Sequence, residues 1–185
     1  MVYVGSLDGK LIALDEKTGR IVWQFVADSP IRSSPAIRVD TVYFGTSLGN
    51  FYALDAVTGE EKWSFSAAAG IRYSAAVTSD TVIFGSDDGR LYSLDSVTGE
   101  EKWVYDAMSA VWSSPAIAGS LVYFADRSGT IHALDIETAE EQWSFDTFPH
   151  INPVASIPAA TMPSPVLSNG VLYFGGGDGL FYALQ

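Results

Sequence analysis

The stretch Val57-Thr58-Gly59-Glu60-Glu61-Lys62-Trp63 recurs unchanged at residues 97–103, and variants of it occupy residues 17–23 and 137–143. The chain therefore contains an internal repeat with a period of 40 residues, which lies in the range of four-stranded β-propeller blades. The positions that keep this spacing are Trp23, Trp63, Trp103 and Trp143; Asp15, Asp55, Asp95 and Asp135; Thr18, Thr58, Thr98 and Thr138; and Gly19, Gly59 and Gly99, with Ala139 in the last unit.

Short β-rich segments separated by turn residues fill each unit. Within residues 41–80, the pattern predicts strands at 41–45, 51–55, 61–66 and 71–78, with turns between them. A helical periodicity is missing from these segments. The sequence therefore predicts an all-β protein, a β-propeller of four-stranded antiparallel blades, with about 4.5 blades in this chain.

The first strand of a unit carries a proline in three cases, at Pro35, Pro115 and Pro165. Proline donates no backbone hydrogen bond and is confined to edge strands or strand ends. We therefore expect this strand to lie innermost, beside the central channel, and the tryptophan-bearing strand to lie at the outer rim. The expected first strands span residues 31–39, 72–78, 112–118 and 163–167.

The turn before each tryptophan follows the pattern Asp-x-x-Thr-Gly, as at Asp55, Thr58 and Gly59. Asp and Thr side chains can accept hydrogen bonds from nearby backbone N–H groups, and Gly supplies a positive φ. The tryptophan that follows offers a large apolar face to the adjacent blade. We therefore expect the repeated Asp and Trp residues to be structural, since the aspartates belong to different blades and cannot converge on a metal ion.

The repeat divides the chain into one propeller domain, or part of one. Three arrangements are open. The chain is part of a larger propeller, it closes alone as a small ring, or it forms a homodimer. In the homodimer, the C-terminal innermost strand of one copy completes the N-terminal three-strand set of the other. Because an unpaired sheet edge is an aggregation hazard, we favour a larger propeller or a homodimer. The expected units are a three-strand set at 2–26, full blades at 31–65, 72–105 and 112–146, and a final three-strand set at 163–184.

The units resemble the PQQ-type propeller repeat, also called the tryptophan-docking motif. The resemblance rests on Val42-Tyr43-Phe44-Gly45, Phe51-Tyr52-Ala53-Leu54-Asp55, Thr58-Gly59-Glu60-Glu61 and Trp63, and it covers essentially the whole chain. WD40 repeats have the same period, but their Gly-His and Trp-Asp dipeptides are missing here. The resemblance implies a propeller that commonly has eight blades, and it implies a periplasmic or cell-envelope location.

Composition restricts the classes of partner. The chain has 185 residues, of which 48% are hydrophobic, and a formal net charge of −12. This charge repels nucleic-acid phosphates, so no nucleic-acid partner is expected. No apolar run reaches the roughly 20 residues of a membrane helix, so direct membrane insertion is not expected, and no signal peptide is visible. The absence of cysteine excludes disulfides and thiolate metal sites.

The strongest candidate site is the mouth of the channel, where the first strands begin. The matching residues there are Arg32, Arg72, Trp112 and Met162. Two arginines and a tryptophan could hold an anionic or planar ligand through ion pairing and stacking. The alternative is that the arginines pair with local carboxylates.

An insertion on the same face is the second candidate. Trp23 and Pro35 are 12 positions apart, whereas Trp143 and Pro165 are 22 apart. The extra segment contains Phe148 and His150, which become candidates for partner binding because per-repeat insertions on one face are often binding elements. The alternative is a tolerated surface loop. The other histidine, His132, aligns with Tyr52 and Tyr92 and is expected only to fill a strand position.

Three functions remain open. The resemblance implies a non-catalytic scaffold that presents a loop face and channel mouth to a protein partner or small ligand, like the propeller lipoprotein of outer-membrane protein assembly. It also implies, as an alternative, a fragment of a PQQ-dependent quinoprotein dehydrogenase. The family's adjacent cysteines are missing and no calcium-ligand set can be assigned, so no catalytic residue and no cofactor, neither PQQ nor calcium, is expected. The third function class is an engineered or recently amplified repeat without a selected ligand.

Overall fold

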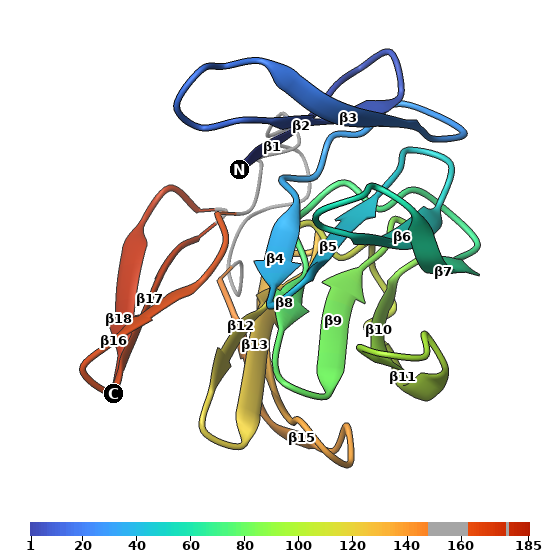
Figure 1. The fold of residues 1–185 in the computed structure, drawn as a ribbon. Coiled ribbons are helices and arrows are strands. Elements are labelled where there is room, and N and C mark those ends of the chain that lie inside the picture. The colour runs from blue at the N-terminus through green and yellow to red at the C-terminus, as the bar shows by residue number, and fades with distance from the viewer. Residues whose placement is uncertain (148–162, 177) are drawn as a thin grey trace.

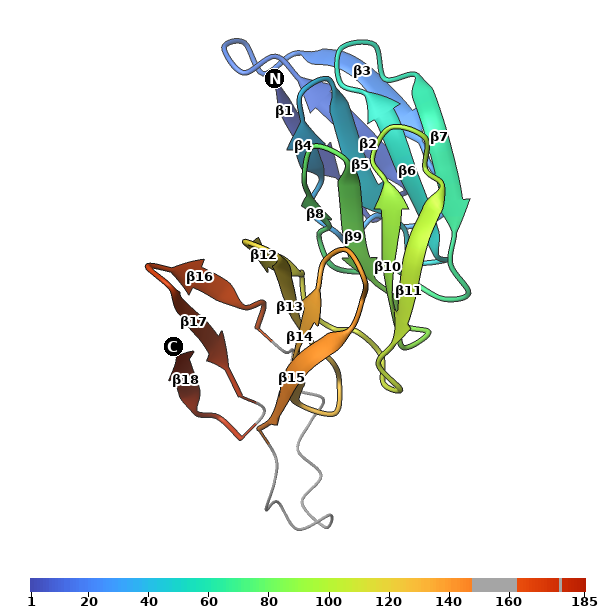
Figure 2. The same cartoon turned by 90° about the horizontal axis from the view of Figure 1, so that it is seen from below.

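The computed structural model describes residues 1–147, 163–176 and 178–185, which form strands and turns without a helix (Figure 1). Antiparallel pairing joins 18 strands into five sheets within these ranges. None of the described residues therefore forms a helix that could cross a membrane. The all-β fold class of four-stranded antiparallel blades is confirmed, and Figures 1 and 2 show the first and last sheets standing apart, as in part of a propeller.

The first four sheets follow the 40-residue repeat along the chain, and the fifth sheet begins 50 residues after the fourth. The first sheet contains β1 (Val2–Gly5), β2 (Lys10–Leu14) and β3 (Ile21–Val26). The second contains β4 (Ala36–Arg38), β5 (Thr41–Gly45), β6 (Asn50–Asp55) and β7 (Glu61–Ser66), and the third contains β8 (Ala76–Val77), β9 (Thr81–Gly85), β10 (Arg90–Asp95) and β11 (Glu101–Asp106). The fourth contains β12 (Ala116–Ala118), β13 (Leu121–Ala125), β14 (Thr130–Asp135) and β15 (Glu141–Asp146), and the fifth contains β16 (Val166–Ser168), β17 (Val171–Gly175) and β18 (Phe181–Leu184).

The first strand of each full blade lies innermost. Strand β4 contacts β8 of the next blade, and β12 contacts β16, whereas the tryptophan-bearing strands β7, β11 and β15 lie at the other edge of their sheets. This order agrees with the position of the prolines, which can sit only where no ladder hydrogen bond is needed.

The innermost strands are shorter than the sequence indicated. Residues 31–39 were expected as one strand, but only Ala36–Arg38 pairs with β5. Before Pro35, the Ser33 hydroxyl donates to the Gly45 carbonyl and accepts from the Gly45 N–H, both at 3.0 Å. A serine side chain therefore satisfies the backbone groups that a longer ladder would have paired. The expected strands at 72–78, 112–118 and 163–167 are likewise shortened or shifted to 76–77, 116–118 and 166–168.

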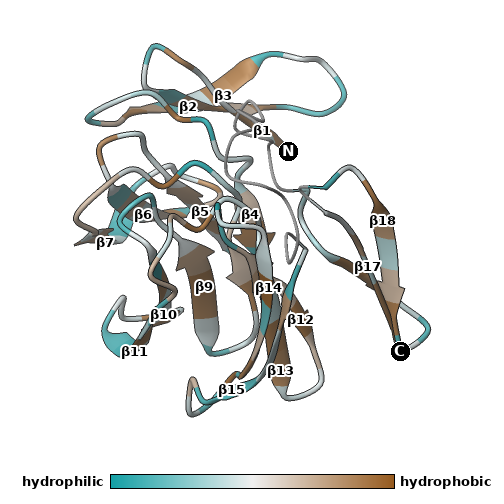
Figure 3. Cartoon of the chain, turned by 180° about the vertical axis from the view of Figure 1, so that it is seen from behind, coloured by the Kyte–Doolittle hydropathy of each residue, from teal (hydrophilic) through white to brown (hydrophobic). Residues whose placement is uncertain are grey.

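The hydrophobic core lies between sheets rather than at one centre. Four apolar clusters each join two neighbouring sheets. In the junction between the second and third sheets, the rings of Phe51 and Phe84 stack with centroids 4.1 Å apart and planes 10° apart. Figure 3 shows apolar residues concentrated along the strands and polar residues at many of the turns. Each blade therefore depends on its neighbours to cover its two faces.

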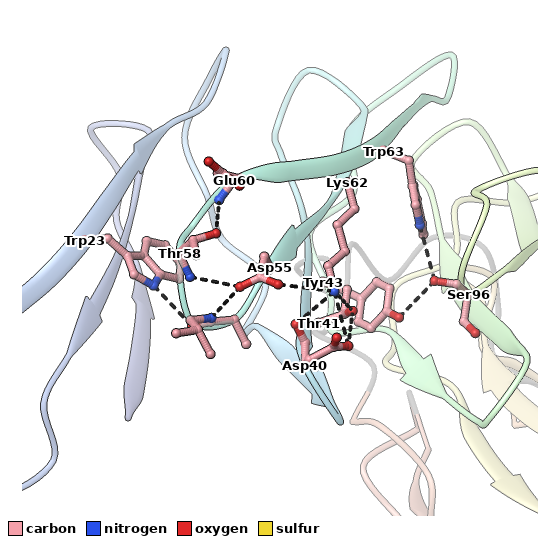
Figure 4. A network of polar contacts seen from close by, with 12 residues as sticks. Trp23, Asp40, Thr41, Tyr43, Asp55, Thr58, Glu60, Lys62, Trp63 and Ser96 are labelled. Atoms are coloured by element: carbon pink, nitrogen blue, oxygen red, sulfur yellow. Dashed lines mark hydrogen bonds and ion pairs between the residues drawn. The ribbon is translucent and has the colours of Figure 1, made fainter.

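The turns before Trp63, Trp103 and Trp143 each meet the tryptophan of the preceding blade, as Figure 4 shows for Trp23 and Trp63. One Asp55 carboxylate oxygen accepts hydrogen bonds from the N–H groups of Val57 and Thr58, each at 2.9 Å. The carbonyl of Ala56 in the same turn accepts a hydrogen bond from Nε1 of Trp23 at 3.1 Å. The same contact recurs from Trp63 to Ser96 at 3.2 Å and from Trp103 to Ile136 at 2.8 Å.

Candidate functional site

Buried anchors fix the positions of the candidate mouth residues. Arg72 follows Ile71, which is fully buried and whose N–H donates to the Thr46 carbonyl of the preceding blade at 2.9 Å. A Cβ atom on Gly45 would lie only 2.2 Å from Cγ2 of Ile71, so this close approach requires glycine. Ile31 and Val111 are anchored in the same way ahead of Arg32 and Trp112.

One carboxylate links two of the predicted residues. Oδ2 of Asp87, in the turn after β9, lies 2.5 Å from Nε of Arg72, and its Oδ1 accepts a hydrogen bond from Nε1 of Trp112 at 2.9 Å. The guanidinium of Arg127 covers the Trp112 ring, with Cζ 4.8 Å from the ring centroid. We call Arg72, Asp87, Trp112 and Arg127 the mouth cluster. It joins two consecutive blades by ion pairing, hydrogen bonding and a cation–π contact.

The mouth cluster has little capacity left for a small ligand. The Nε1 of Trp112 is bonded to Asp87 and one face of its ring is covered by Arg127. Burial and the neighbouring Asp87 charge raise the pKa of Tyr73, which lies beside Arg72. Arg72 therefore follows the alternative interpretation, in which a mouth arginine pairs with a local carboxylate.

Arg32 differs from Arg72. It is exposed, and within residues 1–147, 163–176 and 178–185 it forms no ion pair. The other three mouth and insertion candidates, Met162, Phe148 and His150, lie outside the described residues.

Exposed apolar side chains share the face of the mouth cluster. Leu7 and Leu48 are exposed in the turns after β1 and β5, and Met108 is 88% exposed in the connection from β11 to β12. Met108 also has φ of 62°, a left-handed conformation that is uncommon for a non-glycine residue. We call Leu7, Arg32, Leu48 and Met108, together with the mouth cluster, the mouth face.

The sequence did not single out Asp87, Arg127, Leu48 and Met108 as site residues, because the prediction rested on residues that recur with the repeat. Asp87 and Arg127 align with Leu7 and Ser47, so this position differs in every blade. The variation at this position was the signal that could have identified them. Residues that differ between repeats at one end of the blades are not needed for the shared core and can form a binding surface.

A second polar cluster is buried between the third and fourth sheets. His132 in β14 stacks on Phe124, with centroids 4.7 Å apart, and Tyr105 of the preceding blade meets it edge-on. Its Nδ1 lies 3.0 Å from Oε1 of Glu141, and its Nε2 lies 3.4 Å from Oδ2 of Asp126. His132 thus does more than fill a strand position: it joins two carboxylates of its own blade.

The neighbouring carboxylates of Asp126 and Glu141 stabilise the protonated imidazole of His132. Burial opposes the charged form of His132, but hydrogen bonds to Asp126 and Glu141 outweigh it and raise the pKa of His132. Burial also opposes the Asp126 charge, yet bonds from His132 and Ser128 lower the pKa of Asp126. Burial and the Glu141 charge raise the pKa of Tyr105 to about 12. Both ring nitrogens face carboxylates, so this cluster is a structural ion network.

The described residues do not assemble a metal site. Among residues 1–147, 163–176 and 178–185, no group of three His, Asp or Glu side chains is placed to hold a metal ion.

The chain is similar in fold to several solved propellers. The crystal structure of BamB from Moraxella catarrhalis matches with a TM-score of 0.80 and 23% identity, covering 98% of this chain and 54% of that one. The computationally designed Ika8 protein matches with a TM-score of 0.81 and 19% identity, over 98% and 54%. A europium-containing methanol dehydrogenase matches with a TM-score of 0.77 and 17% identity, over 98% and 46%. These likenesses concern the fold alone.

The family follows from a match along the sequence. No curated protein matches the chain, and the chain spans about half the length of the BamB and Ika8 structures. A family model described as outer membrane protein assembly factor BamB matches residues 1–72 and 65–185. Because these matches cover the whole chain, the protein belongs to the BamB family of PQQ-like repeat β-propellers.

Proposed function

We propose that this chain is a non-catalytic binding module that holds a protein partner on the mouth face. The observation that carries the proposal is that Leu7, Leu48 and Met108 are exposed at the same end of the blades as Arg32, which forms no ion pair with any described residue. Apolar groups with an interspersed arginine are the usual composition of a protein interface. The mouth cluster supports this surface by holding consecutive blades in register.

The family suggests which partner to expect. Its description is an outer membrane protein assembly factor, so we propose that the partner is another component of outer-membrane protein assembly and that the chain acts in the cell envelope, on the periplasmic side. The net charge of −12 favours partner surfaces that are neutral or basic.

Site-directed photo-crosslinking tests the mouth face. A photoreactive residue replaces Leu48 or Met108 in the native host, and crosslinked proteins are identified by mass spectrometry. We expect both positions to crosslink one common protein, and we expect Lys17, at the opposite end of the blades, not to do so. Equal crosslinking from Lys17 would contradict the proposal.

Charge-removal variants give a second readout. Arg32→Ala with Arg72→Ala is expected to lower recovery of the crosslinked partner about tenfold. The matched control, Lys17→Ala with Arg20→Ala, removes two exposed charges from the other face and should leave recovery unchanged. Unchanged recovery in the mouth variant would exclude the arginines from the interface.

An enzymatic alternative rests on the fold likeness to a methanol dehydrogenase. Titrating the chain with PQQ and calcium while following tryptophan fluorescence tests it, because Trp112 lies in the mouth cluster. We expect no saturable change at high micromolar ligand, and a saturable change would favour the enzyme.

We also propose that further blades complete the ring. The BamB and Ika8 structures are nearly twice as long as this chain, and the first and last sheets have three strands each among the described residues. A second copy could supply the missing strands. Light scattering after size-exclusion chromatography tests this, and a stable monomer would exclude the homodimer.

A further inference from the structure

A cavity of about 300 Å³ opens between the second and third sheets, at the end of the blades opposite the mouth face. One wall is the turn from β4 to β5, and the other is the turn from β10 to β11. The lining residues are Arg38, Val39, Asp40, Thr41, Tyr43, Lys62, Ser79, Ser96 and Val97. We call this cavity the valine pocket, after the residues at its two lips.

The backbone conformation of Val39 is energetically unfavourable. Its φ is 52° and its side chain is 89% exposed. A β-branched residue with positive φ is strained, and the equivalent left-handed turns place Gly119 and Asn169 there instead, both residue types that tolerate this region. A strained, exposed valine contributes nothing to the core, so its presence points to a role at the surface.

The opposite lip and the floor complete the pocket. Val97 is 74% exposed and faces the same cavity. The floor is held rigid, since the Tyr43 hydroxyl donates to the Ser96 carbonyl at 3.0 Å and Nζ of Lys62 donates to Oγ1 of Thr41 at 2.9 Å (Figure 4). Two apolar lips over a polar, fixed floor form a site for one apolar side chain.

The charged side chains at the rim of the pocket determine which second group a ligand should carry. Lys62 is already neutralised, with Nζ 3.2 Å from Asp40 and 3.6 Å from Asp55. Arg38 forms no ion pair with any described residue and lines the same pocket. The rim therefore presents the Arg38 cation on a chain whose net charge is −12, and this cation complements a carboxylate.

We propose that the valine pocket binds an extended segment of a protein partner, with an apolar side chain between Val39 and Val97 and an adjacent acidic residue against Arg38. The volume agrees with this size of occupant, because small-molecule pockets begin at about 300 Å³. The pocket lies at the other end of the blades from the mouth face, so it gives the module a second contact that is independent of the first.

A defined peptide tests the proposal. The probe is the blocked tetrapeptide acetyl-Ser-Leu-Asp-Ser-amide, titrated to a few millimolar while the methyl signals of Val39 and Val97 are followed by NMR. We expect saturable shifts at both valines, about threefold weaker binding when the peptide's Asp is Lys, and no saturable shift when its Leu is Ser. The absence of shifts, or equal binding of the Lys peptide, would overturn the proposal.

Val39→Gly separates binding from stability. It relieves the left-handed strain and removes one lip, so we expect a higher midpoint of unfolding together with at least about threefold weaker peptide binding. Ala139→Gly is the matched control, since it relieves similar left-handed strain in a turn that does not line the pocket, and it should leave peptide binding unchanged. Unchanged binding in Val39→Gly would overturn the role of Val39.

Discussion

Gly99 lies so close to Trp63 that a Cβ atom on the glycine would be only 2.6 Å from Cδ2 of the indole. The indole of one blade therefore rests directly on the backbone of the next blade's turn, and its Nε1 reaches the Ser96 carbonyl in the same turn. Turn and tryptophan form one contact, which explains why both recur with the same period.

Gly99→Ala is expected to destabilise the fold by about 2–4 kcal/mol, because it combines the cost of a left-handed alanine with overpacking against Trp63. Urea unfolding measures the change. Gly119→Ala is the matched control: Gly119 has φ of 60°, but a Cβ atom added there would meet nothing within 4 Å. It should lose only about 1–2 kcal/mol, and equal losses in both variants would contradict the packing argument.

Ala139→Gly tests the same contact in reverse. Ala139 occupies the equivalent turn with φ of 61°, where other units have glycine. We expect the glycine variant to be more stable by about 1 kcal/mol, since the left-handed strain is removed at some cost in chain entropy. Urea unfolding measures it, and a loss of stability would show that the alanine side chain makes a favourable contact with Trp103.

The His132 network predicts a loss of stability at alkaline pH. The folded pKa of His132 is raised above its ordinary value of about 6.5. The charged imidazole therefore stabilises the fold fully below that value, and this contribution is lost as pH rises through the folded pKa. Unfolding free energies measured from pH 6 to pH 9 should fall across this window.

Residues found at the equivalent positions of other repeats provide the control for the pH dependence of the unfolding free energy. His132→Tyr introduces the residue found at Tyr52 and Tyr92, but it leaves Asp126, which is 2% exposed, without a cation. This variant should be destabilised most below the folded pKa of His132, where the parent holds a charged imidazole beside Asp126. Adding Asp126→Ser, the residue at Ser6 and Ser86, should restore stability and remove the slope. A slope that persists in the double variant would assign it to another group.

Asp87→Ala should cost about 1 kcal/mol, because Arg72 and Trp112 both lose their acceptor. Urea unfolding in low and high salt separates the two losses: salt screens the partly exposed Arg72 pair but not the hydrogen bond of Trp112. A variant as stable as the parent would show that solvent replaces both contacts.

Much of the fold could be predicted from the sequence because the packing unit is periodic. Trp63 and Asp55 recur at fixed spacing, since the first four sheets meet one another through the same turn. The length of the innermost strand could not be predicted, because Ser33 satisfies the Gly45 backbone with its side chain and ends the ladder early. A hydroxyl that replaces a ladder bond leaves no trace in hydrophobic periodicity.

The polar clusters were only partly predictable, for a related reason. Arg72 and Trp112 were placed on one face by chain direction, but their link through Asp87 joins residues from different blades at a position that does not repeat. Asp126 and His132 each look like ordinary substitutions in a single unit. Only the structure shows that these substitutions sit together and compensate each other.

The tryptophan contact also sets an order for folding during synthesis. Nε1 of Trp23 bonds to a carbonyl 33 residues later in the chain, and Trp63 and Trp103 do the same. A ribosome adds about 5–20 residues per second, so each indole waits about 2–7 seconds for its acceptor to be made. A nascent propeller of this kind therefore always exposes the tryptophan of its newest blade, and that indole is the surface a chaperone would meet first.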